Sequence, residues 1–412
     1  MSQPRRLAIV ATHPIQHFVH LYRALSKCEG VVLKVFFCSR IGLEKYFDRE
    51  MQTEIAWADD LVGGYDHVFL PDGAGIDRST FWTMNNPSVI GALKAFEPNA
   101  VMVYGYATAT ALRVLAWARF EGVPILMTGD GELGRPRSLL KSLVRAGAVR
   151  SIFSQVSAFL TVGDQNERML AAAGVGRNRM FRSPFTIDEA AYRRAAAQRA
   201  ELRGRIRAEF NLPEPAFVAL FVGKLSVRKR PKDLLEAWLA LREQGREAAL
   251  HILYCGNGAE RASLEGFAKE HAIPATFAGF VNVDRLPGFY CAADVLVHPS
   301  EHDPHPLICS EAAAIGLPMI LSDRVGAVGE TDLARAGVNA IVFPCGDIGA
   351  LAAAIGGIET DPERQAEMSA SSRRIYDECD LAASTGGVLR AVEFVTAGRK
   401  RAVDAAPHTQ RT

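Results

Sequence analysis

The sequence predicts an α/β protein built from two doubly wound domains. Short apolar runs of strand length alternate with helical patterns along the whole chain, which is typical of parallel sheets covered by helices. The scheme occurs twice, and an Arg- and Ala-rich stretch with little strand character separates the two series. A chain of 412 residues, 49% of them hydrophobic, is long enough to fill two cores.

The first half contains six predicted strands with helical patterns between them. The strands are LAIVA (7–11), VVLKVFF (31–37), HVFL (67–70), AVMVY (100–104), PILM (124–127) and AFLTV (158–162). The clearest helical patterns cover 17–27, 87–97 and 109–122. We therefore expect an N-terminal domain over residues 1–190.

The second half repeats this scheme after a linker predicted at 191–210. Its strands are AFVALFV (216–222), ALHILYC (249–255), ATFAGF (275–280), DVLVH (294–298), PMILS (318–322) and AIVF (340–343). We expect a C-terminal domain over 211–375, a helix over 376–396 that can return to the N-terminal domain, and a disordered tail over 397–412.

Composition limits the classes of partner and the compartment. Lys and Arg total 47 against 46 for Asp and Glu, so the net charge of +1 gives no overall attraction to nucleic acid. Seven scattered Cys without a C-x-x-C pair indicate reduced thiols. The first apolar stretch is too short for a signal peptide, and no apolar run approaches the roughly 20 residues that span a bilayer. A cytoplasmic protein is expected.

Two basic segments suggest a peripheral membrane contact. The segments 135–150 and 193–207 are helical in pattern and rich in Arg. They could dock on an anionic inner membrane face, although a solvated helix face is the commoner explanation for such stretches.

The first motif places a group of cations at the end of a predicted strand. In FVGKLSVRKRPKDLLEAW (221–238), an apolar strand ends at a glycine, and a helix follows Lys224, Arg228, Lys229 and Arg230. Ligands of open α/β sheets bind beyond the carboxyl ends of the strands, and a helix N-terminus adds partial positive charge. The group suits a diphosphate, but a solvated basic turn explains it equally well.

The second motif surrounds the start of a helix. In VHPSEHDPHPLICSEAAAIGLPMILSDRVG (297–326), a strand leads through a Pro-rich loop into a helix and then into another strand. The free backbone N–H groups of His305, Leu307 and Ile308 could meet an anion.

Two carboxylates accompany this helix. Asp303 precedes it, and Glu311 lies about two turns further along. Charge-assisted hydrogen bonds from sugar or ribose hydroxyls to such carboxylates are worth on the order of 1.5–3 kcal/mol each. Taken singly, Asp303 could be a capping residue and Glu311 an exposed helix position.

In five ordered blocks, the second half resembles the retaining glycosyltransferases of family 4, also called glycosyl transferases group 1, which have the GT-B fold. The blocks are GKLSVRK (223–229), LYCGNGAERASLE (253–265), FAGFV (277–281), LPGFYCAADVLVHPS (286–300) and DPHPLICSEAAAIGLPMILSD (303–323). The resemblance implies two Rossmann-like domains facing a cleft, with a nucleotide-sugar donor on the C-terminal domain. It also implies a carbohydrate or lipid-linked acceptor, transfer to its hydroxyl with retention, and no metal or other cofactor.

The resemblance also assigns roles to individual residues. It implies that Lys224 and Lys229 hold the donor diphosphate. It further implies that Glu311 binds the nucleotide ribose and that Asp303 contacts the donor sugar. Lys229, Asp303 and Glu311 are therefore the catalytic candidates. Further donor contacts are implied for Gly256, His305, Leu307 and Ile308.

The sequence departs from the family pattern at several of these positions. The family usually has Arg at position 224, Gly at 230, Glu at 303 and Phe-Gly at 305–306. Lys224 and Asp303 keep the charge of the usual residue, but Lys224 lacks the bidentate guanidinium. Pro306 has no N–H group, so one backbone contact to the sugar is expected to be lost or displaced.

The N-terminal half supplies the candidates for the acceptor side. The loop in ATHPIQHFVHLYRAL (11–25) contains His13 and His17 but no G-x-G-x-x-G, which argues against a dinucleotide cofactor. His17 could also be a plain helix-surface residue. Tyr106 and Asp130 follow two further strands at the same sheet edge, where either could contact an acceptor or be structural.

Three alternatives remain beside a glycosyltransferase site. His298, His302 and His305 suggest zinc, but prolines at 299, 304 and 306 prevent one continuous helix from presenting them together. A sugar-nucleotide 2-epimerase would share the architecture and the donor. A non-catalytic sugar-nucleotide-binding or scaffold protein with an inherited fold is the third alternative, and the presence of Lys229 and Glu311 argues against it.

Overall fold

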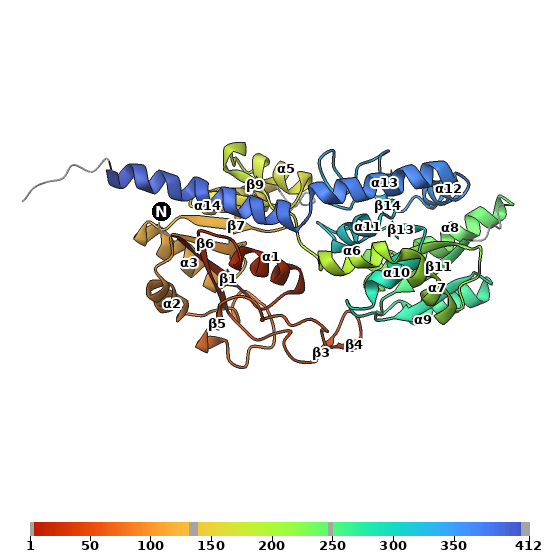
Figure 1. The fold of residues 1–412 in the computed structure, drawn as a ribbon, viewed down its shortest axis with the longest axis horizontal. Coiled ribbons are helices and arrows are strands. Elements are labelled where there is room, and N and C mark those ends of the chain that lie inside the picture. The colour runs from red at the N-terminus through yellow and green to blue at the C-terminus, as the bar shows by residue number, and fades with distance from the viewer. Residues whose placement is uncertain (1–3, 132–138, 246–249, 405–412) are drawn as a thin grey trace, which may run out of the picture.

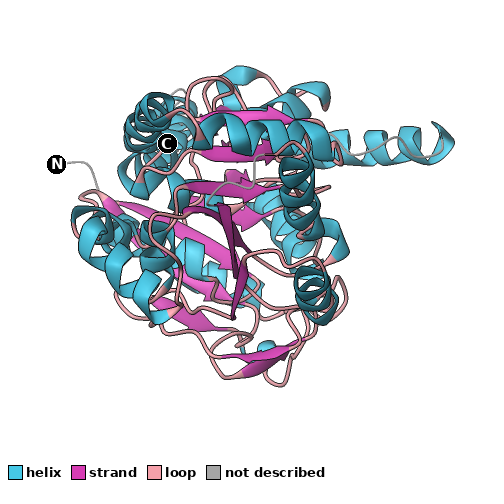
Figure 2. Ribbon diagram, turned by 90° about the vertical axis from the view of Figure 1, so that its right-hand side faces the viewer, coloured by secondary structure: helices cyan, strands magenta, loops and turns pink. Residues whose placement is uncertain are grey.

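The computed structural model describes residues 4–131, 139–245 and 250–404, and shows two α/β domains side by side (Figure 1). Each domain has one large sheet in which every strand pair is parallel. Viewed along the long axis of the molecule, the strands lie between layers of helices (Figure 2). The predicted fold class, two doubly wound domains, is confirmed.

The N-terminal sheet has seven strands in the order β5-β2-β1-β6-β7-β8-β9. They are β1 (Arg5–Ala11), β2 (Val31–Phe37), β5 (His67–Phe69), β6 (Ala100–Tyr104), β7 (Ile125–Thr128), β8 (Ala158–Thr161) and β9 (Met180–Arg182). The helices are α1 (Gln16–Ser26), α2 (Val89–Phe96), α3 (Ala109–Glu121), α4 (Leu139–Phe153) and α5 (Asp164–Ala172), with short 3-10 turns η1 (Pro71–Gly73) and η2 (Arg177–Arg179).

Alternating side chains of the central strand face two different cores, as a pleated strand requires. Ala8 and Val10 of β1 pack with residues of α2, α3 and α5. Leu7 and Ile9 pack on the opposite face, with residues of α1 and of the C-terminal helix α14 (Leu381–Asp404). Because both faces are covered, the strand is an almost continuous apolar run in the sequence.

The C-terminal sheet has six strands in the order β12-β11-β10-β13-β14-β15. They are β10 (Phe217–Val222), β11 (Leu250–Cys255), β12 (Ala275–Gly279), β13 (Val295–His298), β14 (Met319–Ser322) and β15 (Ala340–Phe343). The elements around them are η3 (Val227–Lys229), α8 (Lys232–Glu243), α9 (Arg261–Glu270), α10 (Leu286–Ala292), α11 (Leu307–Ile315), α12 (Ile348–Glu359) and α13 (Pro362–Glu378). The strands β10 and β13 are neighbours, so the loops that follow them meet at one edge.

The predicted linker at 191–210 is mostly helical. It forms most of α6 (Glu189–Ala197) and α7 (Arg199–Glu209), and these helices pack against α10 and α11. Tyr192, Ala195 and Ile206 belong to a core shared with β10. These helices are therefore an integral part of the C-terminal domain's packing.

The C-terminal helix returns to the N-terminal domain and extends further than predicted. A break at residues 379–380 separates α13 from α14, and α14 lies along the N-terminal domain against β8, β9 and α1 (Figure 1). The tail predicted to be disordered from 397 is helical through Asp404, where α14 ends. Residues 405–412 lie outside the described part of the chain.

Two short strands that the sequence did not predict form a hairpin in the N-terminal half. Tyr46–Asp48 (β3) pairs antiparallel with Thr53–Ile55 (β4), and the hairpin points toward the C-terminal domain (Figure 1). A second contact nearby joins the Nδ2 atom of Asn282 to the carbonyl of Ala56 at 2.8 Å. Within the described residues, none of the helices has the length and apolar character needed to cross a membrane.

Candidate donor site and interdomain cleft

Lys229 and Asp303 meet at the edge where β10 and β13 end. Lys229 closes the 3-10 turn η3 after β10, and Asp303 lies in the loop between β13 and α11. The Nζ of Lys229 donates to Oδ2 of Asp303, and that same oxygen accepts a hydrogen bond of 2.8 Å from Nε2 of His298. Both the Lys229 and the Asp303 side chain are only 13% exposed. The first pair of predicted catalytic residues is therefore assembled, with each partner neutralising the other.

The three groups shift one another's protonation. Burial opposes ionisation of Asp303, but the His298 hydrogen bond and the Lys229 charge lower its pKa to about 2. Burial lowers the pKa of Lys229 despite the opposing effect of Asp303. Burial also lowers the pKa of His298. At neutral pH Asp303 is therefore a carboxylate, and its charge favours the protonated form of Lys229.

Lys224, the second predicted diphosphate ligand, contacts the hairpin of the other domain. Its Nζ lies 2.6 Å from Oε2 of Glu50 and 3.2 Å from Oδ2 of Asp48. Burial alone would lower the pKa of Lys224, but these hydrogen bonds and charges raise it. A diphosphate that binds Lys224 would have to displace these two carboxylates or share the ammonium group with them.

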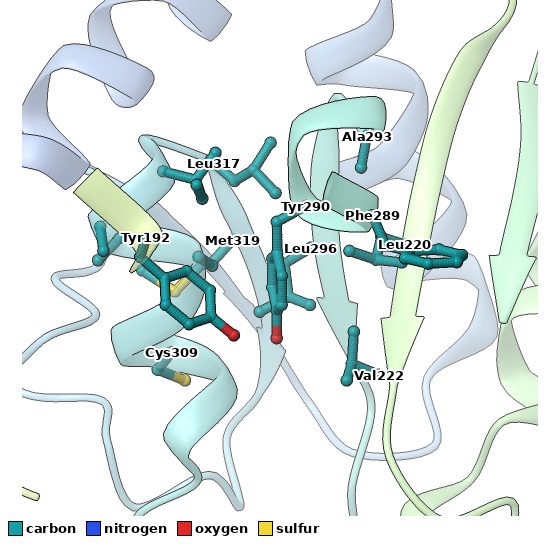
Figure 3. Close-up of a cluster of buried hydrophobic side chains, with 14 of the residues drawn as sticks. Tyr192, Leu220, Val222, Phe289, Tyr290, Ala293, Leu296, Cys309, Leu317 and Met319 are labelled. Carbon is teal, nitrogen blue, oxygen red and sulfur yellow. The ribbon is translucent and has the colours of Figure 1, made fainter. Parts of the chain in front are cut away.

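Glu311 lies inside the domain, beneath two tyrosines. The hydroxyl of Tyr290 on α10 donates to Oε2 of Glu311 at 2.6 Å. Tyr192 on α6 lies next to Tyr290, with both hydroxyls at the same end of the cluster (Figure 3). Burial raises the pKa of Glu311, and the hydrogen bond from Tyr290 opposes this shift. Glu311 is therefore a buried residue and not the exposed helix position considered as an alternative.

His305 lies just before α11 and is held in place by a contact of its side chain. Pro306 caps the helix, whose first residues are Leu307 and Ile308, and both of these pack partly against the core. The imidazole of His305 is buried, and its Nε2 lies 3.1 Å from Oδ1 of Asp332. The sequence suggested a backbone contact to an anion or a zinc ligand at His305, and the contact of its imidazole with Asp332 was not predicted.

Asp332 also ties the two domains together. Its Oδ2 accepts a hydrogen bond of 2.8 Å from the backbone N–H of Asp164, at the start of α5 in the N-terminal domain. Asp164 in turn accepts from the Thr331 hydroxyl at 2.6 Å and from Arg182 at 2.7 Å. The loop after β14 thus fixes the position of His305 relative to the N-terminal domain.

Gly256 has a packing role that explains its residue type. It follows the last residue of β11 and has a φ of 151°, and a Cβ atom at this position would collide with the carbonyl oxygen of Gly223, just after β10. The N–H of Gly256 donates to the carbonyl of Gly279 at 2.7 Å. The predicted donor contact of Gly256 stays a prediction.

On the acceptor side, Phe185 contacts both His17 and His305, which lies in the loop between β13 and α11 (the donor loop). Phe185 lies in the segment that leads from β9 to α6, and its ring centroid is 4.9 Å from that of His17 and 5.9 Å from that of His305. Burial lowers the pKa of His17 to about 4, with a smaller contribution from His13. Burial also lowers the pKa of His13 to about 4. His17 is therefore a half-buried residue, neutral at neutral pH, at the boundary between the domains.

Tyr106 and Asp130 lie apart from this cluster. Tyr106 packs edge-on against Phe153, with 5.9 Å between the ring centroids, and contributes to the core of the N-terminal domain. Asp130 is exposed beyond the end of β7. Their acceptor-side roles stay predictions.

His298, His302 and His305, the histidines considered as zinc ligands, do not form one cluster. His298 binds Asp303 and His305 binds Asp332, so two of the three point to different partners. In the parts of the chain that the structure describes, no group of three or more His, Cys, Asp or Glu side chains is placed to hold a metal ion.

The roles of three residues that position the site were not predicted from the sequence. Tyr290 and Asp332 each reach a site residue that is distant in the chain, and no local spacing marks either of them. His298 was noticed, but as a possible zinc ligand. Its position at the end of a buried strand, five residues before a carboxylate, was the available signal for a hydrogen-bonded pair.

Together, fold and site define a two-domain α/β protein with buried cations at the strand ends of its second domain. Residues 203–375 match the family model described as glycosyl transferases group 1. The chain is 28% identical over 315 residues to a GDP-mannose-dependent alpha-(1-6)-phosphatidylinositol dimannoside mannosyltransferase of Mycobacterium tuberculosis, covering 74% of this chain and 77% of that protein.

Two further comparisons agree. A D-inositol 3-phosphate glycosyltransferase of Salinispora tropica is 30% identical over 198 residues, which cover 46% of this chain and 40% of that protein. The crystal structure of Anabaena HepE in complex with UDP superposes with a TM-score of 0.70 at 15% identity, covering 94% of this chain and 99% of that one. Residues 203–375 therefore form a glycosyl transferases group 1 domain, the chain as a whole has the GT-B fold, and the findings support a nucleotide-sugar glycosyltransferase. The epimerase alternative has no support.

Proposed function

We propose that this enzyme transfers a hexosyl group from a nucleoside diphosphate sugar to a hydroxyl of a carbohydrate or lipid-linked acceptor, with retention at the anomeric carbon. We place it in the synthesis of a cell-envelope polysaccharide or glycoconjugate. The buried cluster of Lys229, Asp303 and His298 at the strand ends is the observation that carries the proposal. A diphosphate leaving group develops negative charge in the transition state, and a preorganised ammonium group stabilises that charge.

In this proposal, the donor rearranges the existing ion pairs. Lys229 turns from Asp303 toward the diphosphate, and the freed carboxylate of Asp303 accepts a hydrogen bond from the donor sugar. Lys224 exchanges Glu50 and Asp48 for a phosphate oxygen. Glu311 binds the ribose hydroxyls, with its orientation fixed by Tyr290.

The acceptor side completes the site when the domains close. The attacking hydroxyl and the anomeric carbon must come within about 3–3.5 Å of each other. His17 and His13, both neutral, could accept or donate hydrogen bonds to an acceptor hydroxyl without adding charge. Tyr106 and Asp130 contribute to the site only if closure of the domains brings the N-terminal loops to the donor.

We further propose that catalysis requires no metal ion, because Lys224 and Lys229 supply positive charge where the diphosphate would lie. The test has two steps. A thermal-shift screen against UDP-, GDP- and ADP-sugars selects the donor, and transfer is then measured with and without EDTA. Full activity in EDTA and a product with the donor's anomeric configuration are expected. Inversion, or activity lost in EDTA and restored by Mn²⁺, would contradict the proposal.

We propose a cytoplasmic location, at the inner face of the membrane if the acceptor is lipid-linked. The name of the M. tuberculosis relative, which specifies a phosphatidylinositol dimannoside, supports a lipid-linked acceptor. Segment 135–150 lies partly outside the described residues. Cell fractionation tests this location. Activity found only in fractions from outside the cytoplasmic membrane would overturn the proposal.

A further inference from the structure

We propose that the C-terminal domain carries a second ligand site, a pocket that binds a phosphate-bearing group between α6, α7 and the start of α10. The pocket encloses about 230 Å³. Its polar lining consists of Arg194, Gln198, Arg205, Asp284 and Arg285. None of these residues belongs to the donor site described above.

The contacts of the basic segment 193–207 single out this pocket. The segment has six arginines, and four of them are bound within the protein. Arg193 pairs with Glu189 and Asp377, Arg199 donates to the carbonyl of Ala293, and Arg203 and Arg207 both pair with Asp294. The other two, Arg194 and Arg205, both line the pocket, and neither forms an ion pair with a described residue.

Helix geometry explains why these two arginines converge. Ala191, Arg194, Ala195 and Gln198 follow the i, i+3, i+4, i+7 spacing and line the pocket from one face of α6. Arg205 lines it from α7, which passes close to α10: a Cβ atom on Gly288 would lie 3.3 Å from Ile206. The lining thus combines small residues such as Ala191, Ala195 and Gly288 with arginines that come from two different helices.

The charge balance of the pocket favours an anion. Three guanidinium groups face it against one carboxylate, that of Asp284. Arg285 donates to Glu209 at 2.6 Å and is thereby partly neutralised, so the two unpaired arginines carry the attraction. Guanidinium groups bind phosphate oxygens in a bidentate manner, and Gln198 adds an amide donor.

The pocket and the proposed ribose site share helix α6. Tyr192 is on an adjacent face of α6, buried beside Tyr290, which hydrogen-bonds to Glu311. The burial that raises the pKa of Tyr192 is reinforced by the charge of Glu311. The same phosphate chemistry is offered by a soluble phosphate ester and by an inositol phospholipid headgroup, and the experiment separates these two sources.

The test uses the full-length protein saturated with its nucleoside diphosphate, so that the donor site is filled. Unfolding temperature is followed against potassium phosphate, with potassium chloride at equal ionic strength as the reference. The wild type should show a saturable rise. The double variant Arg194→Ala/Arg205→Ala should lose affinity for phosphate by about tenfold or more, because charge-assisted hydrogen bonds to phosphate are lost.

Two further variants separate binding from folding. Arg364→Ala removes an exposed arginine of α13 and should behave as wild type. Arg194→Lys/Arg205→Lys keeps the charge and should retain part of the affinity. Because Arg194 and Arg205 are exposed, the double alanine variant should keep its unfolding temperature in chloride.

Flotation with phosphatidylcholine vesicles, with and without phosphatidylinositol, identifies the source of the phosphate. Flotation that requires phosphatidylinositol and is lost in the double alanine variant assigns a lipid headgroup. A saturable phosphate effect without flotation assigns a soluble ligand. An unsaturable phosphate effect, or one that the double alanine variant retains in full, would overturn the second site.

Discussion

The two sides of the domain boundary hold their polar groups in opposite ways. On the donor side, Lys229 and Asp303 form an ion pair, whereas on the acceptor side the half-buried His13 and His17 have pKa values lowered to about 4 and are neutral at neutral pH. A buried charge persists only when it is compensated, and an imidazole without a counter-charge gives up its proton instead. The difference matches an anionic donor and an uncharged hydroxyl acceptor.

The largest expected effect comes from removing the donor-side cation. Lys229→Ala should lower the rate of transfer by about 10²–10³, because one preorganised group no longer stabilises the leaving diphosphate. The measurement is kcat under saturating donor. Lys232→Ala, an exposed lysine three residues away, serves as the control and should retain its rate.

The loss of Lys229 also leaves Asp303 buried without its cation, which should destabilise the protein. Lys229→Ala/Asp303→Asn removes both charges and should regain stability while remaining slow. If the double variant recovers the wild-type rate, the rate loss was a folding effect and the comparison between the two sides fails.

A smaller effect is expected at the ribose. Glu311→Gln should raise the donor KM by about 10- to 100-fold with little change in kcat, since the ribose contact is made in both the ground and the transition state. Tyr290→Phe removes the hydrogen bond that orients Glu311 and should change KM in the same direction by less. A fall in kcat at unchanged KM would assign Glu311 a different role.

The neutral acceptor side predicts loss of stability in mild acid. The folded-state pKa values of His13 and His17 are about 4, below the ordinary 6.5, so the unfolded chain binds more protons between these limits. Stability is therefore full above pH 6.5 and is lost as the pH falls toward 4, on the order of 1 kcal/mol for each histidine. Urea unfolding from pH 7 to 4.5 measures it, and His17→Gln should flatten the slope. A slope unchanged in that variant contradicts the neutral state of His17.

The smallest effect is expected at the hairpin. Glu50→Gln frees Lys224 from its shortest partner and should lower the donor KM two- to fivefold, in line with the roughly 0.2–1 kcal/mol of an exposed ion pair. Glu54→Gln, on the same hairpin and paired with Lys45, is the matched control. If both variants behave alike, Glu50 does not compete with the donor.

The sequence predicted the strands that are buried on both faces, because such strands are continuous apolar runs. It missed β3, β4 and β9, which have three residues each and, unlike the equally short β5, each contain an Asp, Glu or Arg that interrupts the apolar run. For the site, two motifs located Lys229, Asp303 and Glu311 on their loops and helix. The partners of these residues depend on contacts between distant segments, such as Tyr290 with Glu311 and Asp332 with His305, which no local pattern encodes.

The chain passes between the domains twice, and the two passages run side by side. The Ser183 hydroxyl lies 3.0 Å from that of Ser384, and a Cβ atom on Gly387 would collide with the carbonyl of Arg182. Because α14 then packs on the first sheet, the N-terminal domain is assembled from both ends of the polypeptide. A chimera that exchanges donor specificity should therefore transplant residues 184–380 as one insert and keep α14 with its original acceptor domain.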